Sequence, residues 1–170
     1  MLSLSQFSKL AGVSVMSMEL AIFSSRQLSI QDWQAAIDAE GYPLRLSPQM
    51  VFECLSGFFP MYLRGELTGF ECYREDVSAV RNKVSDIDIE QEWKFVLVFV
   101  WLGSKENELL AAWMAATAYA QATDGMILDG EAGKMCTPAD ARVLVHDLEH
   151  PSPAALAAMQ EIRERLSRKE

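Results

Sequence analysis

The apolar positions of this chain are densest in its second half, where an uninterrupted run, Phe95–Leu102, is rich in β-branched and aromatic residues. A run of this length and composition predicts a strand that is covered on both faces. Strong helix formers, mainly alanine, follow over 109–121, and Gly125 ends that stretch before a second apolar run, Met126–Leu128. The pattern therefore predicts a strand, a helix and a strand that together form the hydrophobic centre of the protein.

Capping signals predict where the helices begin and end. Ser104 is expected to cap the central helix with its hydroxyl. The capping-box-like segment Ser29–Asp32 predicts a helix that Gly41 ends. Thr137–Asp140 is a second capping box, with Pro138 at the first helical position, and it predicts a helix up to about residue 150.

Alternating apolar and polar positions predict the remaining strands. Residues 18–23 are expected to form the first core strand, and residues 42–46 a short strand at a sheet edge because Pro43 cannot donate a ladder hydrogen bond. Residues 58–63 and 67–73 predict a hairpin. Gly69, inside the second arm, indicates either a bulge or a close approach of the backbone.

After Pro151 we expect a last amphipathic helix. Its apolar positions recur at three- and four-residue spacing and form one stripe: Leu156, Met159, Ile162 and Leu166. Such a stripe either packs on the chain's own domain or forms the seam of a homodimer, and the pattern leaves both arrangements open.

Together these elements predict an α+β fold, with one domain, a mainly antiparallel sheet of about five or six strands and helices packed on it. We expect an N-terminal extension over residues 1–17, the α+β domain over 18–150 and the C-terminal helix over 151–170. A chain of 170 residues is long enough for one full core and short for two.

Composition narrows the class of protein. Half of the residues are hydrophobic, and no apolar run approaches the roughly 20 residues of a membrane-spanning helix. Three widely spaced cysteines (Cys54, Cys72 and Cys136) match neither a disulfide framework nor a zinc site. The first 17 residues lack the uninterrupted apolar stretch of a signal peptide, so we expect a cytoplasmic protein.

The net charge of −9 narrows the class of partner. Binding to nucleic acid requires clustered lysine and arginine, so we expect no nucleic-acid partner, and for the same reason no anionic membrane surface. A basic protein is the partner that this charge favours.

Acidic residues concentrate between Glu66 and Glu92, where eight acids stand against three bases and give a net charge of −5. A solvated loop with an edge strand accounts for this pattern. So does a docking face for a basic protein, on which charge speeds encounter and fixes orientation. Phe70 and Tyr73 would then supply the aromatic anchors that interfaces favour. The candidate partner-binding residues are Glu71, Tyr73, Asp76, Asp86, Asp88, Glu90 and Glu92.

Two motifs in the sequence are similar to motifs found in enzymes. His146–His150 matches the H-x-x-E-H pattern of inverted zincins, in which both histidines bind zinc and the glutamate acts as base. Its helix is expected to end at Pro151, however, where the helix dipole favours histidine without any metal. Gly130–Lys134 has the glycines of a phosphate loop without its spacing, and predicts a turn between short strands. We therefore expect no catalytic residue, no metal ligand and no cofactor.

Four stretches carry a resemblance to a known group of proteins: Met18–Phe23, Trp33–Gly41, Gly69–Tyr73 and Thr123–Asp129. In the order of these elements the chain resembles the small cytoplasmic immunity proteins that accompany bacterial polymorphic toxins, including toxins delivered by type VI secretion. The resemblance covers roughly residues 18 to 145. Its motifs are strand, cap and turn signals, so it assigns no site residue.

The resemblance implies a non-enzymatic protein that binds its cognate toxin and occludes the toxin's active site. With the acidic segment as the contact surface, this is the leading hypothesis. One alternative is a structural or adaptor protein that self-associates through the stripe of the last helix. The less favoured alternative is a metal-dependent hydrolase that uses His146–His150.

Overall fold

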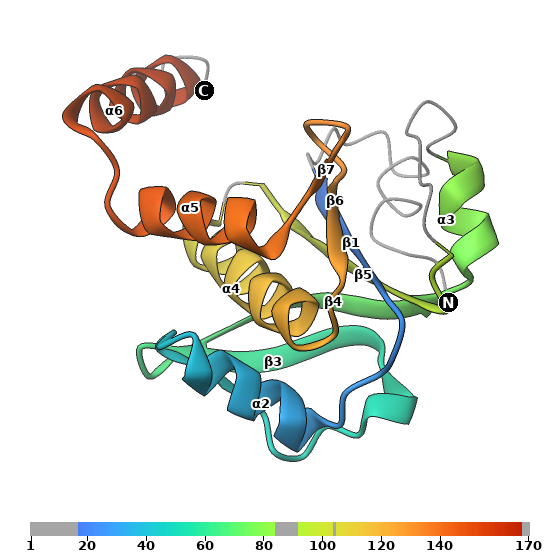
Figure 1. Cartoon of the computed structure of the whole chain (residues 1–170). Helices are drawn as coiled ribbons and strands as arrows, with labels where there is room; N and C mark the ends of the chain where they lie inside the picture. The colour runs from blue at the N-terminus through green and yellow to red at the C-terminus, as the bar shows by residue number, and fades with distance from the viewer. Residues whose placement is uncertain (1–16, 84–91, 104, 168–170) are drawn as a thin grey trace.

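Strands and helices are interspersed along the chain, and the strands form one sheet (Figure 1). The computed structural model describes residues 17–83, 92–103 and 105–167. The strands are β1 (Ser17–Ser24), β2 (Leu44–Leu46), β3 (Ser56–Leu63), β4 (Glu66–Glu75), β5 (Phe95–Leu102), β6 (Met126–Asp129) and β7 (Lys134–Cys136). The helices are α2 (Ile30–Ala39), α3 (Val77–Lys83), α4 (Glu106–Ala122), α5 (Pro138–Glu149) and α6 (Pro153–Ser167), with a 3-10 turn at Phe52–Cys54.

The seven strands form one sheet in the order β2-β3-β4-β5-β1-β6-β7, and neighbouring strands pair antiparallel throughout. The predicted α+β class and antiparallel sheet are confirmed. The strand count is higher than predicted because the three-residue strand β7 adds a seventh strand at one edge, and β2 at the other edge is the short edge strand predicted over residues 42–46. Among the described residues, no helix has the length and apolar character needed to cross a membrane.

Helix α4 is the centre of the core. Every residue from Leu110 to Ala120 is buried, so the helix has no solvent-facing side over three turns. The sheet covers one side of α4, and α2 and α5 flank it on that same face of the sheet (Figure 1). The predicted cap is wrong: the N-cap is Lys105, without a side-chain capping bond, and Ser104 lies outside the described residues.

Strand β5 is buried on both faces, as predicted. Leu97, Phe99 and Trp101 face the helices and belong to the main core, and Val96, Val98 and Val100 pack on the opposite face in a second cluster with Phe23 and Trp93. The alternation explains the uninterrupted apolar run, because both faces of this central strand lie away from water.

Trp33 of α2 packs between helix α4 and strand β5 of the sheet. Its side chain is fully buried, and its indole Nε1 donates a hydrogen bond of 3.0 Å to the carbonyl oxygen of Ala115 in α4. The ring stacks on Phe99 of β5 with centroids 5.8 Å apart and meets the edge of Tyr119 at 5.1 Å. One side chain therefore satisfies a buried donor and joins three elements.

The predicted caps of α2 and α5 are confirmed. Ser29 Oγ accepts the backbone N–H of Asp32 at 3.0 Å, and Thr137 with Asp140 forms the complete capping box. The β3–β4 hairpin turns at Arg64 and Gly65, whose φ angles are 51° and 82°. Two positive φ values in a two-residue loop match the twist of the flanking strands.

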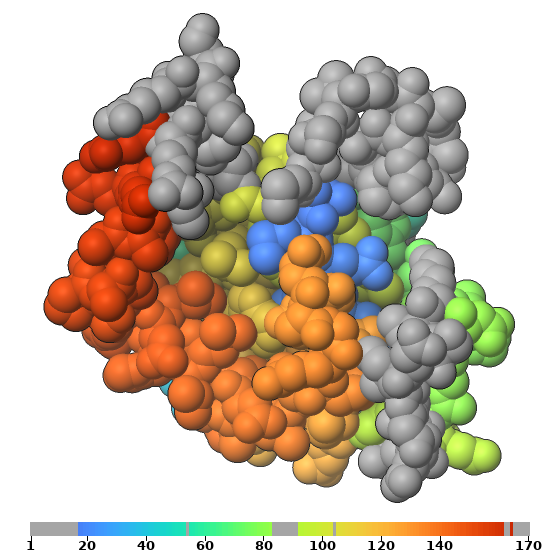
Figure 2. Space-filling view, turned by 90° about the horizontal axis from the view of Figure 1, so that it is seen from above, coloured from blue at the N-terminus to red at the C-terminus, as the bar shows by residue number. Residues whose placement is uncertain are grey.

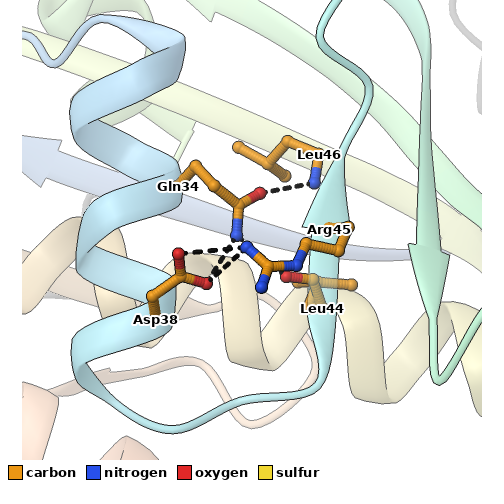
Figure 3. A network of polar contacts seen from close by, with 5 residues as sticks. All are labelled: Gln34, Asp38, Leu44, Arg45 and Leu46. Atoms are coloured by element: carbon orange, nitrogen blue, oxygen red, sulfur yellow. Dashed lines mark hydrogen bonds and ion pairs between the residues drawn. The ribbon is translucent and has the colours of Figure 1, made fainter.

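The free edge of strand β2 forms hydrogen bonds with a side chain and not with another strand (Figure 3). Gln34 of α2 accepts the N–H of Leu46 at 2.7 Å through Oε1 and donates through Nε2 to the carbonyl of Leu44 at 3.0 Å. Asp38 Oδ1 accepts a hydrogen bond of 2.9 Å from Nε2 of Gln34. The Asp38 carboxylate also forms an ion pair of 2.9 Å with Arg45. The amide of Gln34 thus occupies the bonding groups that an incoming strand would use.

Replacing Gln34 by alanine is expected to destabilise the protein by about 1–2 kcal/mol, because two backbone groups of β2 lose their partner. The measurement is the urea midpoint, with size-exclusion chromatography to detect edge-to-edge association. The matched control is Gln31→Ala, an exposed glutamine on the same helix, which should leave the midpoint unchanged. Equal midpoints for the two variants would contradict this role of Gln34.

Candidate protein-binding face

The two faces of the sheet differ in how they are covered. Helices α2, α4 and α5 cover one face, and α3 packs against β5 on the opposite side, here called the outer face. Along β3 the side chains alternate: Phe59, Met61 and Leu63 are buried under the helices, whereas Phe58 and Tyr62 lie on the outer face. On the outer face the β3–β4 hairpin therefore exposes large apolar side chains.

Three of these side chains form what we call the outer apolar stripe: Phe58, Tyr62 and Leu67, which are 57%, 44% and 66% exposed. Tyr62 and Leu67 are direct cross-strand partners. Phe58 lies on the same side of β3 as Tyr62, with Pro60 between them at two-residue spacing. Single exposed apolar residues are ordinary on protein surfaces, but neighbouring ones on a flat strand pair are typical of interaction sites.

Gly69 lies under the ring of Phe58, one member of the outer apolar stripe. A Cβ atom at this position would lie 2.4 Å from the carbonyl oxygen of Phe59 and 2.7 Å from the ring of Phe58, so the Phe58 ring covers the glycine. The register runs through Pro60 and Gly69 without a bulge. Of the two roles predicted for Gly69, close backbone approach is therefore the correct one, and it holds Phe58 against the sheet.

Acidic and aromatic groups continue this face along β4. Glu71 is the cross-strand partner of Phe58, and its carboxylate accepts a hydrogen bond from the hydroxyl of Tyr73. Burial, then the hydrogen bond to Glu71 and the charge of Glu71, raise the pKa of Tyr73 well above its usual range. The pair therefore presents a fixed carboxylate next to the outer apolar stripe.

At the other end of the stripe Arg45, the cross-strand partner of Tyr62, is paired with Asp38. Glu66, which precedes Leu67 in β4, is exposed at this end. Acids of β4 therefore lie at both ends of the outer apolar stripe.

Asp76 has a structural role at the end of β4. Its Oδ1 accepts the backbone N–H of Ser78 at 2.8 Å and also the Ser78 hydroxyl, which caps the first turn of α3. Hydrogen bonds from the Ser78 side chain, the Ser78 backbone and the Ala79 backbone lower the pKa of Asp76. Asp76 remains exposed, and so does the adjacent Glu75.

The structure brings together some of the predicted partner-binding residues. Glu71 and Tyr73 are in contact on the outer face, Asp76 follows them at the start of α3, and Glu92 is exposed beside the buried Trp93. The other three candidates, Asp86, Asp88 and Glu90, lie outside the described residues.

Phe70 is not an anchor, because it points into the core. It is 1% exposed, and its ring stacks on Phe99 with centroids 4.3 Å apart. The exposed aromatic residues near the acids are instead Phe58 and Tyr62. The sequence FFPMYL of β3 is apolar at every position, so its period could not show which of its side chains face outward.

Beyond Asp76 lies a hollow of about 460 Å³, which is lined in part by Glu75, Asp76, Arg81 and Lys94. Two acids and two bases face one another there. The hollow therefore does not extend the acidic surface that the described residues form on β4 and at the start of α3.

The two catalytic-looking motifs take local structural roles. The rings of His146 and His150 lie 4.9 Å apart at the end of α5, and the backbone N–H of His150 closes the helix on the carbonyl of His146. Within the described part of the chain, no three potential ligands lie together as a metal site requires. Gly130–Lys134 forms the predicted turn between β6 and β7, where Asp129 Oδ1 accepts the N–H groups of Glu131 and Ala132.

Comparison of the chain with family models, curated proteins and solved structures finds no match. Function is therefore argued from the surface itself, since a fold class alone does not determine what a protein does.

Replacing Asp76 by alanine should destabilise the protein at pH 7 and do so less at pH 3. A carboxyl group whose pKa is lowered by folding contributes stability above its ordinary pKa of 3.8, and this is lost as the pH falls through the folded value. The urea midpoints of wild type and variant measure the difference at each pH. Asp76→Asn is the control, because it keeps a capping oxygen but does not titrate. An equal loss at both pH values in Asp76→Ala would contradict the cap.

Proposed function

We propose that this chain is a non-enzymatic, immunity-type protein that binds a basic bacterial toxin and neutralises it by covering the toxin's active site. The observation that carries the proposal is the outer apolar stripe, Phe58, Tyr62 and Leu67, lying directly beside the Glu71–Tyr73 pair. The resemblance of the chain to immunity proteins supports the same function.

The outer apolar stripe supplies affinity. Completely burying a side chain of this size is worth about 1.5–3 kcal/mol, and aromatic residues are enriched among the positions that dominate binding energy. The stripe lies on paired strands, and Phe58 is held against Gly69, so little side-chain freedom remains to be lost on binding.

The acids supply orientation and speed of encounter. Glu71 lies beside the stripe, Glu75 and Asp76 lie at its continuation, and the whole chain carries a net charge of −9. A toxin that acts on nucleic acids or nucleotides needs a positively charged cleft to hold phosphate groups. An acidic, aromatic face complements such a cleft and leaves no room for substrate.

The test uses the purified product of the reading frame that neighbours this gene, measured by isothermal titration calorimetry and by rescue of bacterial growth. Phe58→Ala, Tyr62→Ala and Leu67→Ala should each weaken binding about tenfold to a hundredfold, since each removes an apolar anchor. Glu71→Gln should slow association and flatten its dependence on salt.

The matched control is Val143→Ala, because Val143 is 62% exposed on α5, away from the outer face. It should bind as the wild type does. Wild-type affinity in all three anchor variants would exclude the outer face as the contact surface. If the wild-type chain neither binds the neighbouring product nor restores growth, the immunity function is wrong.

A further inference from the structure

Glu71 carries a carboxylate oxygen that the described part of the chain does not use. Its Oε2 accepts the hydrogen bond from the Tyr73 hydroxyl, and its Oε1 accepts none within residues 17–83, 92–103 and 105–167. Over the same ranges Glu71 forms no ion pair with a lysine or an arginine. The Glu71 side chain is partly buried, and partly buried charges are screened less than exposed ones. A cation supplied by another molecule would therefore gain more here than at a fully exposed acid.

An exposed aromatic ring lies across the strand pair from this carboxylate. Phe58 is the cross-strand partner of Glu71, and its side chain is 57% exposed. Cross-strand partners have Cβ atoms about 4.5–5.5 Å apart, so one side chain of a bound molecule can contact both residues. The ring rests on Gly69, which holds it in place. Phe58 and Glu71 both attract a cation, the first through the quadrupole of its ring and the second through its charge.

We propose that Phe58, Glu71 and Tyr73 bind an arginine side chain of the partner protein, and they are here called the arginine site. This inference rests on the proposed function, because it names the side chain through which the toxin is held. A guanidinium group is planar and carries five N–H donors in a fixed fork. It can therefore lie on the Phe58 ring while it donates hydrogen bonds to the acceptors beside that ring. A lysine ammonium group has no plane to stack and is more strongly hydrated.

Tyr73 provides the second acceptor of the arginine site. It lies two residues after Glu71 on the same face of β4, and its hydroxyl proton is donated to Oε2 of Glu71. The hydroxyl oxygen of Tyr73 keeps its lone pairs as acceptors. Together with Oε1 of Glu71 it offers two acceptors on neighbouring side chains, which match two donors of one guanidinium group.

The experiment titrates the isotope-labelled full chain with three small probes at matched ionic strength: N-acetylarginine amide, its neutral isostere N-acetylcitrulline amide, and N-acetyllysine amide. The readout is the backbone amide resonances of Gly69 and residue 71 by NMR. The Phe58 ring covers Gly69, so its ring current reports any group that stacks on it or moves it. Arginine amide should shift these resonances saturably and bind about tenfold more tightly than citrulline amide. Lysine amide should bind more weakly than arginine amide.

Two variants locate the site. Glu71→Gln keeps an oxygen for the Tyr73 hydroxyl but removes the charge, and Phe58→Leu keeps an apolar cover over Gly69 but removes the ring. Each should weaken the binding of arginine amide by about threefold to fivefold. The matched control is Asp147→Asn, which changes an exposed acid on α5 and should leave the affinity unchanged. Figure 2 shows α5 and α6 at one border of the molecule and α3, which packs on the outer face, at the opposite border.

Three results would overturn the inference. Equal binding of arginine amide and citrulline amide would show that the charge is not recognised. Equal affinities in Glu71→Gln and Asp147→Asn would place the contact away from Glu71. Lysine amide that binds as tightly as arginine amide would contradict the choice of a guanidinium group.

The probes also separate this inference from the proposed function, because they need no toxin. If arginine amide binds as expected while the neighbouring gene's product neither binds nor is neutralised, the arginine site stands and the immunity function fails. If that product binds and growth is restored while arginine amide shifts neither resonance, the arginine site fails and the immunity function stands.

Discussion

The structure depends on one constraint: α4 is apolar around its whole circumference, so it must be enclosed. Its buried stretch, Leu110–Ala120, is largely alanine and therefore allows backbones to approach closely. The sheet encloses it on one side, and α2 and α5 enclose it on the others. Trp33 fixes this arrangement through its bond to Ala115 and its contact with Phe99.

Enclosing α4 gathers three helices on one face of the sheet and leaves the opposite face unequally covered. At the centre, α3 and Trp93 pack over the valines of β5. Toward the β2 edge the hairpin β3–β4 keeps its outer side chains in contact with water, although Phe58, Tyr62 and Leu67 are apolar. An apolar surface that folding does not bury is available to a partner. The neighbouring Glu71 adds negative charge to this surface.

Much of this fold could be predicted from local signals. The strand–helix–strand centre, the caps at Ser29 and Thr137 and the hairpin turn depend on residues close together in sequence, and the structure confirms them. The outer apolar stripe could not be predicted, because β3 is apolar at successive positions and only the packing of α4 determines which side is covered. Phe70 of β4, which the acidic segment predicts as a surface anchor, lies instead in the core. The predicted acids Glu71 and Asp76 do lie at this face, yet Asp76 is also a helix cap.

Hydroxyl-radical footprinting of the free protein and of its complex with the neighbouring gene's product tests the central claim most directly. Exposed phenylalanine, tyrosine, leucine and valine side chains are each oxidised according to their own accessibility. The account predicts that oxidation of Phe58, Tyr62 and Leu67 falls in the complex, while that of Val143 on α5 does not change. Unchanged oxidation of these three side chains, with protection appearing on α5 instead, would contradict it.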